Sequence, residues 1–185
     1  MTVAQTMVRA LGVIAAGTML LAVTSAQAAP EQQASNRGLE MRDATLRLAT
    51  FPNQVADVAG GSQVDGAKTV QWVLTGAPNQ RWETEASLDG YYRFKSGNSG
   101  MCLNVINASG ADGAPVIQHT CGGAPNELWK PLRRIIGYQL INKNSGKCLA
   151  VEGGAGQGHG LIQFGCSPNG DPSDVWLAVW EPPFS

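Results

Sequence analysis

The chain has 185 residues, a formal net charge of −1 at pH 7 and 15% charged residues. It contains no basic block that would hold phosphates, so nucleic acid is not expected as a partner. The apolar run from Leu11 to Val23 is too short to cross a membrane, and no other stretch approaches the required length. Membrane insertion is therefore not expected either.

The N-terminus has the pattern of a secretory signal. Arg9 precedes the apolar run, and the small-residue cleavage pattern Ala26-Gln27-Ala28 follows it. We expect a signal peptide at residues 1–28 and a secreted, extracellular mature protein. Residues 29–43 are polar and lack apolar periodicity, which is typical of a flexible segment. The extracellular compartment is oxidising, so disulfides are expected among the four cysteines.

One motif occurs three times, and each copy ends in a tryptophan. Trp82, Trp129 and Trp176 follow one another at intervals of 47 residues. A fixed period of this size indicates a repeat architecture. The three copies predict a threefold object with repeats at about 44–90, 91–136 and 137–183. The motifs themselves are GAPNQRW at 76–82, GAPNELW at 123–129 and GDPSDVW at 170–176.

Short β-type runs separated by Gly, Pro, Asn and Asp predict an all-β fold, since no stretch has a sustained helical period. Asp65-Gly66 and Asp112-Gly113 are hairpin-turn signals, and Gly158-His159-Gly160 takes their place in the third repeat. The glycine-rich segment 153–160 lacks the spacing of a nucleotide-binding loop. The expected strands are 45–48, 55–58 and 69–74, then 92–95, 102–105 and 116–121, and finally 138–141, 148–151 and 161–166.

The cysteines lie at equivalent positions in two of the repeats. This register favours the pairs Cys102 with Cys121 and Cys148 with Cys166 among the three possible connectivities. Each bridge would close a loop of about 20 residues, worth about 3 kcal/mol in the chain-entropy model. The first repeat has an apolar pair at these positions. A zinc site is not expected, because there is no C-x-x-C and only two histidines are present. No cofactor is expected.

Three Q-x-W-like motifs, C-L-x-V strands and V-I-Q-aromatic strands resemble the ricin B-chain-like (R-type) β-trefoil lectins. Only the motif ending at Trp82 keeps the literal Q-x-W; Glu127 and Asp174 replace Gln in the others. The resemblance spans residues 44 to about 180 and implies a lectin domain at 44–183. It implies a six-stranded barrel closed by three hairpins, with pseudo-threefold symmetry. The tryptophans of the three motifs are then expected in the core.

In such lectins each sugar stacks on an aromatic ring and bonds to an acid or amide and to the Asn before the closing motif. A pyranose has one face of C–H groups and a rim of hydroxyls, so a pocket needs both kinds of group. In the first repeat the resemblance assigns Trp72 as the platform, Asp57 as the acceptor and Asn79 as a sugar contact. Gln80 would donate to Asp57. Alternatively, Trp72 packs in the interior, since it shares its strand face with apolar neighbours.

The second repeat offers Asn104, His119, Asn126 and Glu127 at the corresponding positions. An amide and an acid have exchanged places relative to the first repeat, so we expect Asn104 to donate to Glu127. This predicts a retained but altered pocket in which His119 is a smaller stacking surface. The alternative is an ordinary strand histidine beside a structural Asn/Glu pair.

The third repeat has Phe164 as a platform but Ala150, Ser173 and Asp174 at the polar positions. The side chain of Ala150 forms no hydrogen bonds, so we expect this pocket to have lost sugar binding. The loop at 167–172 is longer than its counterparts and offers a surface for another partner.

The resemblance implies a secreted, non-catalytic, monomeric protein that binds galactose-type sugars or polysaccharides such as xylan. Shallow pockets bind weakly, so several on one body would act together. The alternative is a protein-binding trefoil, such as a protease inhibitor, acting through the loop at 167–172. Neither G-x-S-x-G nor H-E-x-x-H is present, and an enzyme is not expected. Any catalytic partner is expected to be a separate polypeptide.

Overall fold

The computed structural model of the protein describes residues 42–180. The expected signal peptide at 1–28, most of the expected flexible segment at 29–43 and the expected end of the domain at 181–183 lie outside these residues. The described residues form twelve strands and short 3-10 helices. The all-β prediction is confirmed.

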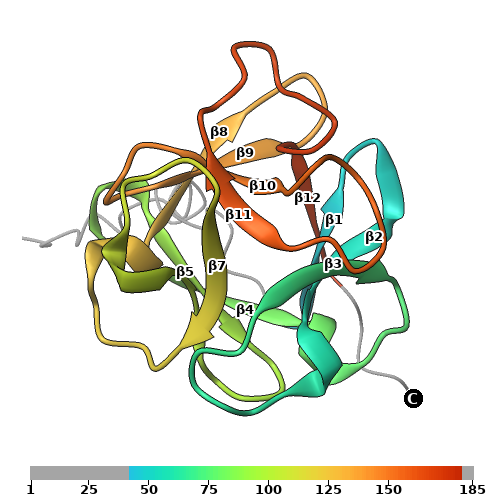
Figure 1. The fold of residues 1–185 in the computed structure, drawn as a ribbon, viewed down its shortest axis with the longest axis vertical. Helices are drawn as coiled ribbons and strands as arrows, with labels where there is room; N and C mark the ends of the chain where they lie inside the picture. The colour runs from blue at the N-terminus through green and yellow to red at the C-terminus, as the bar shows by residue number, and fades with distance from the viewer. Residues whose placement is uncertain (1–41, 181–185) are drawn as a thin grey trace, which may run out of the picture.

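Each repeat contributes four strands, which Figure 1 shows in successive colours. The first has β1 (Ala44–Leu48), β2 (Phe51–Val58), β3 (Thr69–Val73) and β4 (Trp82–Ala86). The second has β5 (Tyr92–Ser96), β6 (Cys102–Val105), β7 (Ala114–His119) and β8 (Trp129–Arg133). The third has β9 (Tyr138–Asn142), β10 (Cys148–Val151), β11 (Leu161–Phe164) and β12 (Trp176–Trp180). The 3-10 helices are η1 (Ala59–Gly61), η2 (Pro78–Gln80), η3 (Leu88–Gly90), η4 (Ile106–Ala108) and η5 (Pro125–Glu127).

Six of these strands form a closed antiparallel barrel. Strand β1 pairs with β4 and β12, β5 pairs with β4 and β8, and β9 pairs with β8 and β12, so the ring has no free edge. The remaining strands form the hairpins β2–β3, β6–β7 and β10–β11, which contact one another across the cap. This arrangement is the predicted β-trefoil (Figure 1).

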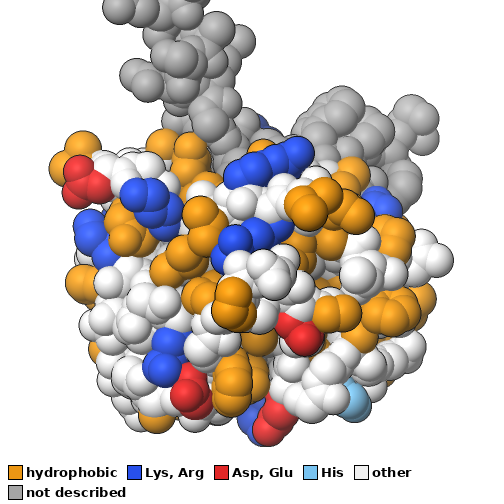
Figure 2. All heavy atoms as spheres, turned by 90° about the horizontal axis from the view of Figure 1, so that it is seen from above, with side chains coloured by type: hydrophobic (Ala, Val, Ile, Leu, Met, Phe, Trp, Pro, Cys, Tyr) orange, Lys and Arg blue, Asp and Glu red, His pale blue; other side chains and the backbone are white. Residues whose placement is uncertain are grey.

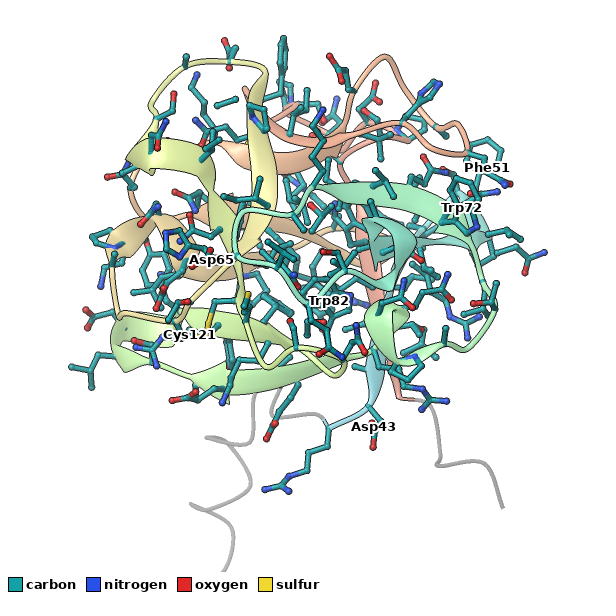
Figure 3. All side chains as sticks on the ribbon, turned by 60° about the horizontal axis from the view of Figure 1, so that its bottom comes forward. Asp43, Phe51, Asp65, Trp72, Trp82 and Cys121 are labelled. Carbon is teal, nitrogen blue, oxygen red and sulfur yellow. A yellow bond between two sulfur atoms is a disulfide. The ribbon has the colours of Figure 1, made fainter. Side chains whose placement is uncertain are left out.

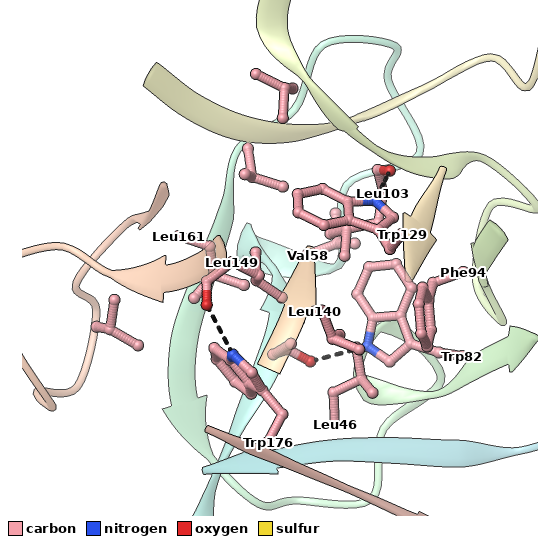
Figure 4. Close-up of a cluster of buried hydrophobic side chains, with 14 of the residues drawn as sticks. Leu46, Val58, Trp82, Phe94, Leu103, Trp129, Leu140, Leu149, Leu161 and Trp176 are labelled. Carbon is pink, nitrogen blue, oxygen red and sulfur yellow. Dashed lines mark hydrogen bonds between the residues drawn. The ribbon is translucent and has the colours of Figure 1, made fainter. Parts of the chain in front are cut away.

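The three motif tryptophans lie in the core, as predicted. Trp82, Trp129 and Trp176 are 0%, 0% and 1% exposed. Each is the first residue of a barrel strand, and its indole N–H donates to a backbone carbonyl in a hairpin strand of its own repeat (Figure 4). The acceptors are Ala56, Leu103 and Leu149, at 3.1, 2.9 and 3.0 Å. Each indole therefore ties the barrel to the cap.

Both predicted disulfides are present, with Cα–Cα distances of 5.2 Å for Cys102–Cys121 and 5.0 Å for Cys148–Cys166. Strands β7 and β11 end two residues before the second cysteine of each pair, so both end earlier than expected; β7 also begins two residues earlier, at Ala114. Each bridge therefore ties the segment after a hairpin to the hairpin's first strand. The predicted turns are confirmed, because Gly66, Gly113 and Gly158 all adopt positive φ.

In the second and third repeats, a buried glutamine of the hairpin forms hydrogen bonds to the hairpin turn of the preceding repeat. Gln118 donates through Nε2 to the carbonyls of Ser62 and Val64, at 2.9 and 2.8 Å, and accepts from the Ser99 hydroxyl at 2.7 Å. The third repeat has the same pattern, with Gln163 bonded to the carbonyls of residues 109 and 111 and to the hydroxyl of residue 145. These contacts hold each turn against the neighbouring hairpin.

The first repeat departs from this pattern. Gln71 accepts from the Gly156 N–H at 2.9 Å, so the third repeat docks onto the first and closes the cycle. The buried Nε2 of Gln71, however, has no hydrogen-bond partner. Pro52 stands where the other repeats have Ser99 and Ser145, so no hydroxyl is available to orient the amide.

This asymmetry gives a matched pair of variants. Gln118→Leu removes three hydrogen bonds, whereas Gln71→Leu removes one and also removes a buried donor without a partner. We expect Gln118→Leu to lower the free energy of unfolding by about 1–3 kcal/mol more than Gln71→Leu. Guanidinium unfolding with the disulfides intact measures both. Equal losses would show that the glutamine contacts do not set the stability of the cap.

Candidate functional site

Three pockets lie at equivalent positions, one in each repeat. Their volumes are about 500, 490 and 320 Å³ in the first, second and third repeats. Each is built on the second and third strands of its repeat and on the segment before the closing tryptophan. The structure therefore brings together the residues that the sequence assigned to each pocket.

The first pocket is lined by Asp57 on β2, Trp72 on β3 and Asn79 in η2. Trp72 is 39% exposed and lies toward the edge of the domain, whereas Trp82 lies in the interior (Figure 3). Trp72 is thus not one of the core residues. Asp57 is only 5% exposed, so one wall of the pocket is an open indole face and another is a nearly buried carboxyl.

Two amides hold Asp57 from behind. Gln80 donates through Nε2 to Oδ2 at 2.9 Å, as predicted, and Asn79 donates through Nδ2 to Oδ1 at 2.9 Å. Asn79 also donates to the Val58 carbonyl at 3.0 Å, so both of its amide hydrogens are used within the protein. The Asn79 side-chain oxygen is the atom that remains for a ligand.

The local backbone fixes which way the Gln80 amide points. Pro78 begins η2, where its fixed φ suits the first position of a helical turn. Gln80 then accepts through Oε1 from the N–H groups of Thr75 and Gly76, at 2.7 and 3.1 Å. With the oxygen committed to these N–H groups, the nitrogen faces Asp57. The loop thus orients the donor that holds the carboxyl.

Burial raises the pKa of Asp57 above its ordinary value of 3.8, and the hydrogen bonds from Gln80 and Asn79 offset part of this effect. The carboxyl therefore stays protonated to a higher pH than an exposed aspartate. An acceptor in this pocket is sensitive to acid for that reason.

The second pocket is lined by Asn104, His119, Asn126 and Glu127. Asn126 donates to the Asn104 oxygen and to the Val105 carbonyl, both at 2.8 Å, as Asn79 does in the first repeat. The side-chain nitrogen of Asn104 has no hydrogen bond among the described residues. The second pocket therefore offers an amide donor where the first offers a carboxyl acceptor.

The predicted hydrogen bond from Asn104 to Glu127 is wrong. Glu127 is 1% exposed, and it accepts instead from Arg93 Nε at 2.9 Å and from the N–H groups of Gly122 and Gly123. A buried carboxylate needs a charged or multiple donor, which a single amide does not supply. Arg93 lies on barrel strand β5, where the first repeat has Leu46. The presence of Arg93 at the position of Leu46 is the sequence feature that indicates the Arg93–Glu127 pair.

Two pocket walls come from a neighbouring repeat, which the sequence reasoning missed. Asp65 lines the second pocket, with Oδ1 3.2 Å from His119 Nδ1, and it accepts from the Thr120 hydroxyl at 2.9 Å. Gly158 lines the first pocket, where a Cβ would lie 3.4 Å from the Trp72 ring. The turn signals at these positions predicted the hairpins, but they did not indicate which neighbouring pocket each turn contacts.

The third pocket has the expected platform, because Phe164 lines it and is 51% exposed. Asp174 is buried and accepts from Gln139 Nε2 at 2.7 Å and from the N–H and hydroxyl of Ser167 at 3.1 and 2.8 Å. Asp174 is therefore fully engaged in holding the long loop at 167–172.

Among residues 42–180, no group of three His, Cys, Asp or Glu side chains is arranged to hold a metal ion. No helix in the same part of the chain is long and apolar enough to cross a membrane.

A closed six-stranded barrel capped by three hairpins, with one such unit per repeat, defines a β-trefoil. The family model for ricin-type β-trefoil lectin-like domains matches residues 44–119 and 85–164. The chain belongs to this family. No curated protein matches the chain.

Solved structures agree with this assignment. The designed threefold-symmetric protein ThreeFoil is 34% identical, with a TM-score of 0.70 over 74% of this chain and 96% of its own. The exo-β-1,3-galactanase 1,3Gal43A from Clostridium thermocellum is 26% identical, with a TM-score of 0.70 over 76% of this chain and 30% of its own. The Rhizoctonia solani agglutinin is 14% identical, with a TM-score of 0.68 over 78% and 98%, and shares the fold.

The acid sensitivity of Asp57 is measurable by NMR titration of its carboxyl carbon. We expect a pKa above 3.8, and a further rise in Gln80→Leu because that variant removes a hydrogen bond that lowers the pKa. Since the folded pKa exceeds the unfolded value, the Asp57 contribution to folding stability is present below 3.8 and is lost as pH rises through the folded pKa.

Asp112 and Asp171 are internal controls for this titration. The bond from Lys147 lowers the pKa of Asp112, and bonds from Ser173 lower that of Asp171. Their pKa values should lie below 3.8, and Gln80→Leu should leave both unchanged. A value for Asp57 at or below 3.8 would contradict the account.

Proposed function

We propose that the protein is a secreted, non-catalytic carbohydrate-binding protein that acts through its first and second pockets. One observation carries the proposal: an open indole and a carboxyl held by two amides share a cavity of about 500 Å³. A pyranose presents an apolar C–H face and a rim of hydroxyls, and this cavity provides a surface for each.

In the first pocket, the sugar ring stacks on Trp72 and its hydroxyls donate to Asp57. Each carboxyl oxygen of Asp57 accepts one amide hydrogen from the protein and has a second lone pair for a ligand. The Asn79 oxygen provides one more acceptor. Because the protein holds these atoms in place before the sugar arrives, little ordering entropy is lost on binding.

The second pocket binds with different polarity. The free amide nitrogen of Asn104 donates to a sugar oxygen, and the His119 ring, held beside Asp65, provides the stacking surface. The histidine face is smaller than an indole, so it covers less of the sugar. We expect the second pocket to be the weaker of the two.

Galactose-type sugars, or polysaccharides such as xylan, are the ligands that we propose. An axial hydroxyl gives galactose one continuous C–H face, which suits a single indole platform. Family membership supports sugar binding, and a similar domain occurs in an exo-β-1,3-galactanase, which acts on a galactose polymer. The carboxyl and amide groups of the pockets are accounted for as binders, so catalysis is not proposed.

The binding logic is multivalent. Two pockets on one rigid body, or several molecules on one polymer, convert weak single-site binding into higher avidity through effective concentration. We propose a monomer. On the face shown in Figure 2, Lys and Arg side chains as well as Asp and Glu side chains are scattered among apolar and uncharged ones. Such a face does not favour a strongly charged polymer over a neutral one.

A glycan array and a polysaccharide pull-down test the proposal with the mature protein. Trp72→Ala should weaken binding at least tenfold, which corresponds to about 1.4 kcal/mol for a lost stacking surface. His119→Ala should have a smaller effect. Leu88→Ala is the matched control, because Leu88 is 81% exposed and lines neither pocket.

Two results would reject the proposal. One is the absence of any glycan binding by the wild type. The other is binding that Trp72→Ala leaves intact. Protease inhibition that depends on the loop at 167–172 and is unaffected by pocket variants would select the protein-binding alternative instead.

A further inference from the structure

The third pocket has changed its chemistry rather than simply lost it. Ala150 stands where the other repeats have Asp57 and Asn104, and it lines the pocket together with Val151 and Ile162. These three side chains are 5%, 3% and 8% exposed, so they form an apolar floor. Phe164, 51% exposed, stands beside it as an open ring.

A carboxylate has appeared at another position in the same pocket. Asp171 lines the pocket and replaces the alanines found at 77 and 124 in the other repeats. Its Oδ1 accepts from the N–H and hydroxyl of Ser173, at 2.9 and 2.7 Å. Its Oδ2 has no hydrogen bond among residues 42–180. One carboxylate oxygen of Asp171 can therefore accept a hydrogen bond from a ligand that lies on the apolar floor.

The loop that carries Asp171 is fixed by the buried acid behind it. Asp174 accepts from the Asp171 N–H at 2.7 Å, and the Asp174 N–H donates back to the Asp171 carbonyl at 3.0 Å. Gln139, on barrel strand β9, donates to Asp174 and to the Ser167 carbonyl. Asp171 thus has a fixed place relative to Phe164 and Ala150.

These groups select against a fully hydroxylated sugar ring. A hydroxyl placed on Ala150 would lose its water hydrogen bonds without replacement. The pocket suits a sugar that has a small apolar substituent for the floor, an N–H donor for the Asp171 oxygen and a C–H face for Phe164. An acetamido group carries the methyl and the N–H together.

We propose that the third pocket binds N-acetylated amino sugars, with the acetamido methyl on the Ala150 floor and its N–H donating to Asp171. This inference rests on the proposed function in taking the chain as a carbohydrate binder, and it replaces the expectation that the third pocket lost sugar binding. The three pockets then differ in kind: an acceptor, a donor and an apolar floor with an acid at its rim.

The test uses a variant in which the other pockets are disabled, Trp72→Ala with His119→Ala. Amide NMR shifts are followed during titration with the methyl glycosides of N-acetylglucosamine, N-acetylgalactosamine, their parent hexoses, glucosamine and a 6-deoxyhexose. We expect an N-acetylated sugar to shift the amides of Gly165 and Ser173 and to bind at least tenfold more tightly than its parent hexose.

Three further variants locate the site. Adding Phe164→Ala should weaken N-acetylated sugar binding at least tenfold, and Asp171→Asn should weaken it several-fold. Ala150→Asn places the amide of the second repeat at this position, fills the apolar floor and should abolish the preference for the acetamido group. Leu88→Ala should change nothing.

Several outcomes would overturn the inference while leaving the proposed function intact. The first is that the wild type binds hexoses while the double variant binds no N-acetylated sugar. The second is that the double variant binds glucosamine or the 6-deoxyhexose more tightly than the N-acetylated sugars. The third is that Phe164→Ala leaves the binding of N-acetylated sugars unchanged. Conversely, binding of N-acetylated sugars by the double variant, lost in Phe164→Ala, supports the inference even where the wild type binds no hexose. In that case the assignment of the first two pockets fails.

Discussion

The indole hydrogen bond that joins each barrel strand to its hairpin is the interaction on which the rest of the structure depends. Trp82, Trp129 and Trp176 each fill the core and donate to a carbonyl in a hairpin strand, so one side chain supplies both apolar burial and a fixed position for the hairpin. The residue two places before each tryptophan then reaches the back of a pocket. Core packing and pocket geometry are thereby coupled within a segment of a few residues.

The sequence predicted the fold well because the repeat period made each element visible three times. Nine strands, the turns and both disulfides followed from the register, and the structure contains them with some strand ends shifted; the strand that begins at each motif tryptophan had no residue range in the prediction. The Gln80 bond to Asp57 also followed, because the first repeat keeps the literal Q-x-W motif together with the acid on its second strand. The site is predictable where the repeat keeps the pattern of the lectins that it resembles.

Contacts between layers were not predictable in the same way. Glu127 pairs with Arg93 and Asp174 with Gln139, two barrel residues at the position of Leu46 in the first repeat. The first residue of each Q-x-W-like motif thus changes together with a barrel residue some 35 positions earlier, and the pairing depends on burial that the sequence does not show. The prediction of a hydrogen bond between Asn104 and Glu127 was wrong because it considered only the partners of Glu127 within the pocket and not those on the barrel.

The walls that pass from one repeat to the next constrain how such a domain arises. Asp65 of the first repeat completes the pocket of the second, and Gly158 of the third completes that of the first. An isolated copy of the first or the second repeat would hold only part of its binding surface, whereas the third pocket is lined by residues of the third repeat alone. A mutation in the turn that carries Asp65 or Gly158 therefore changes the pocket of the neighbouring repeat, so the first two sites evolve under a shared constraint while the third diversifies independently.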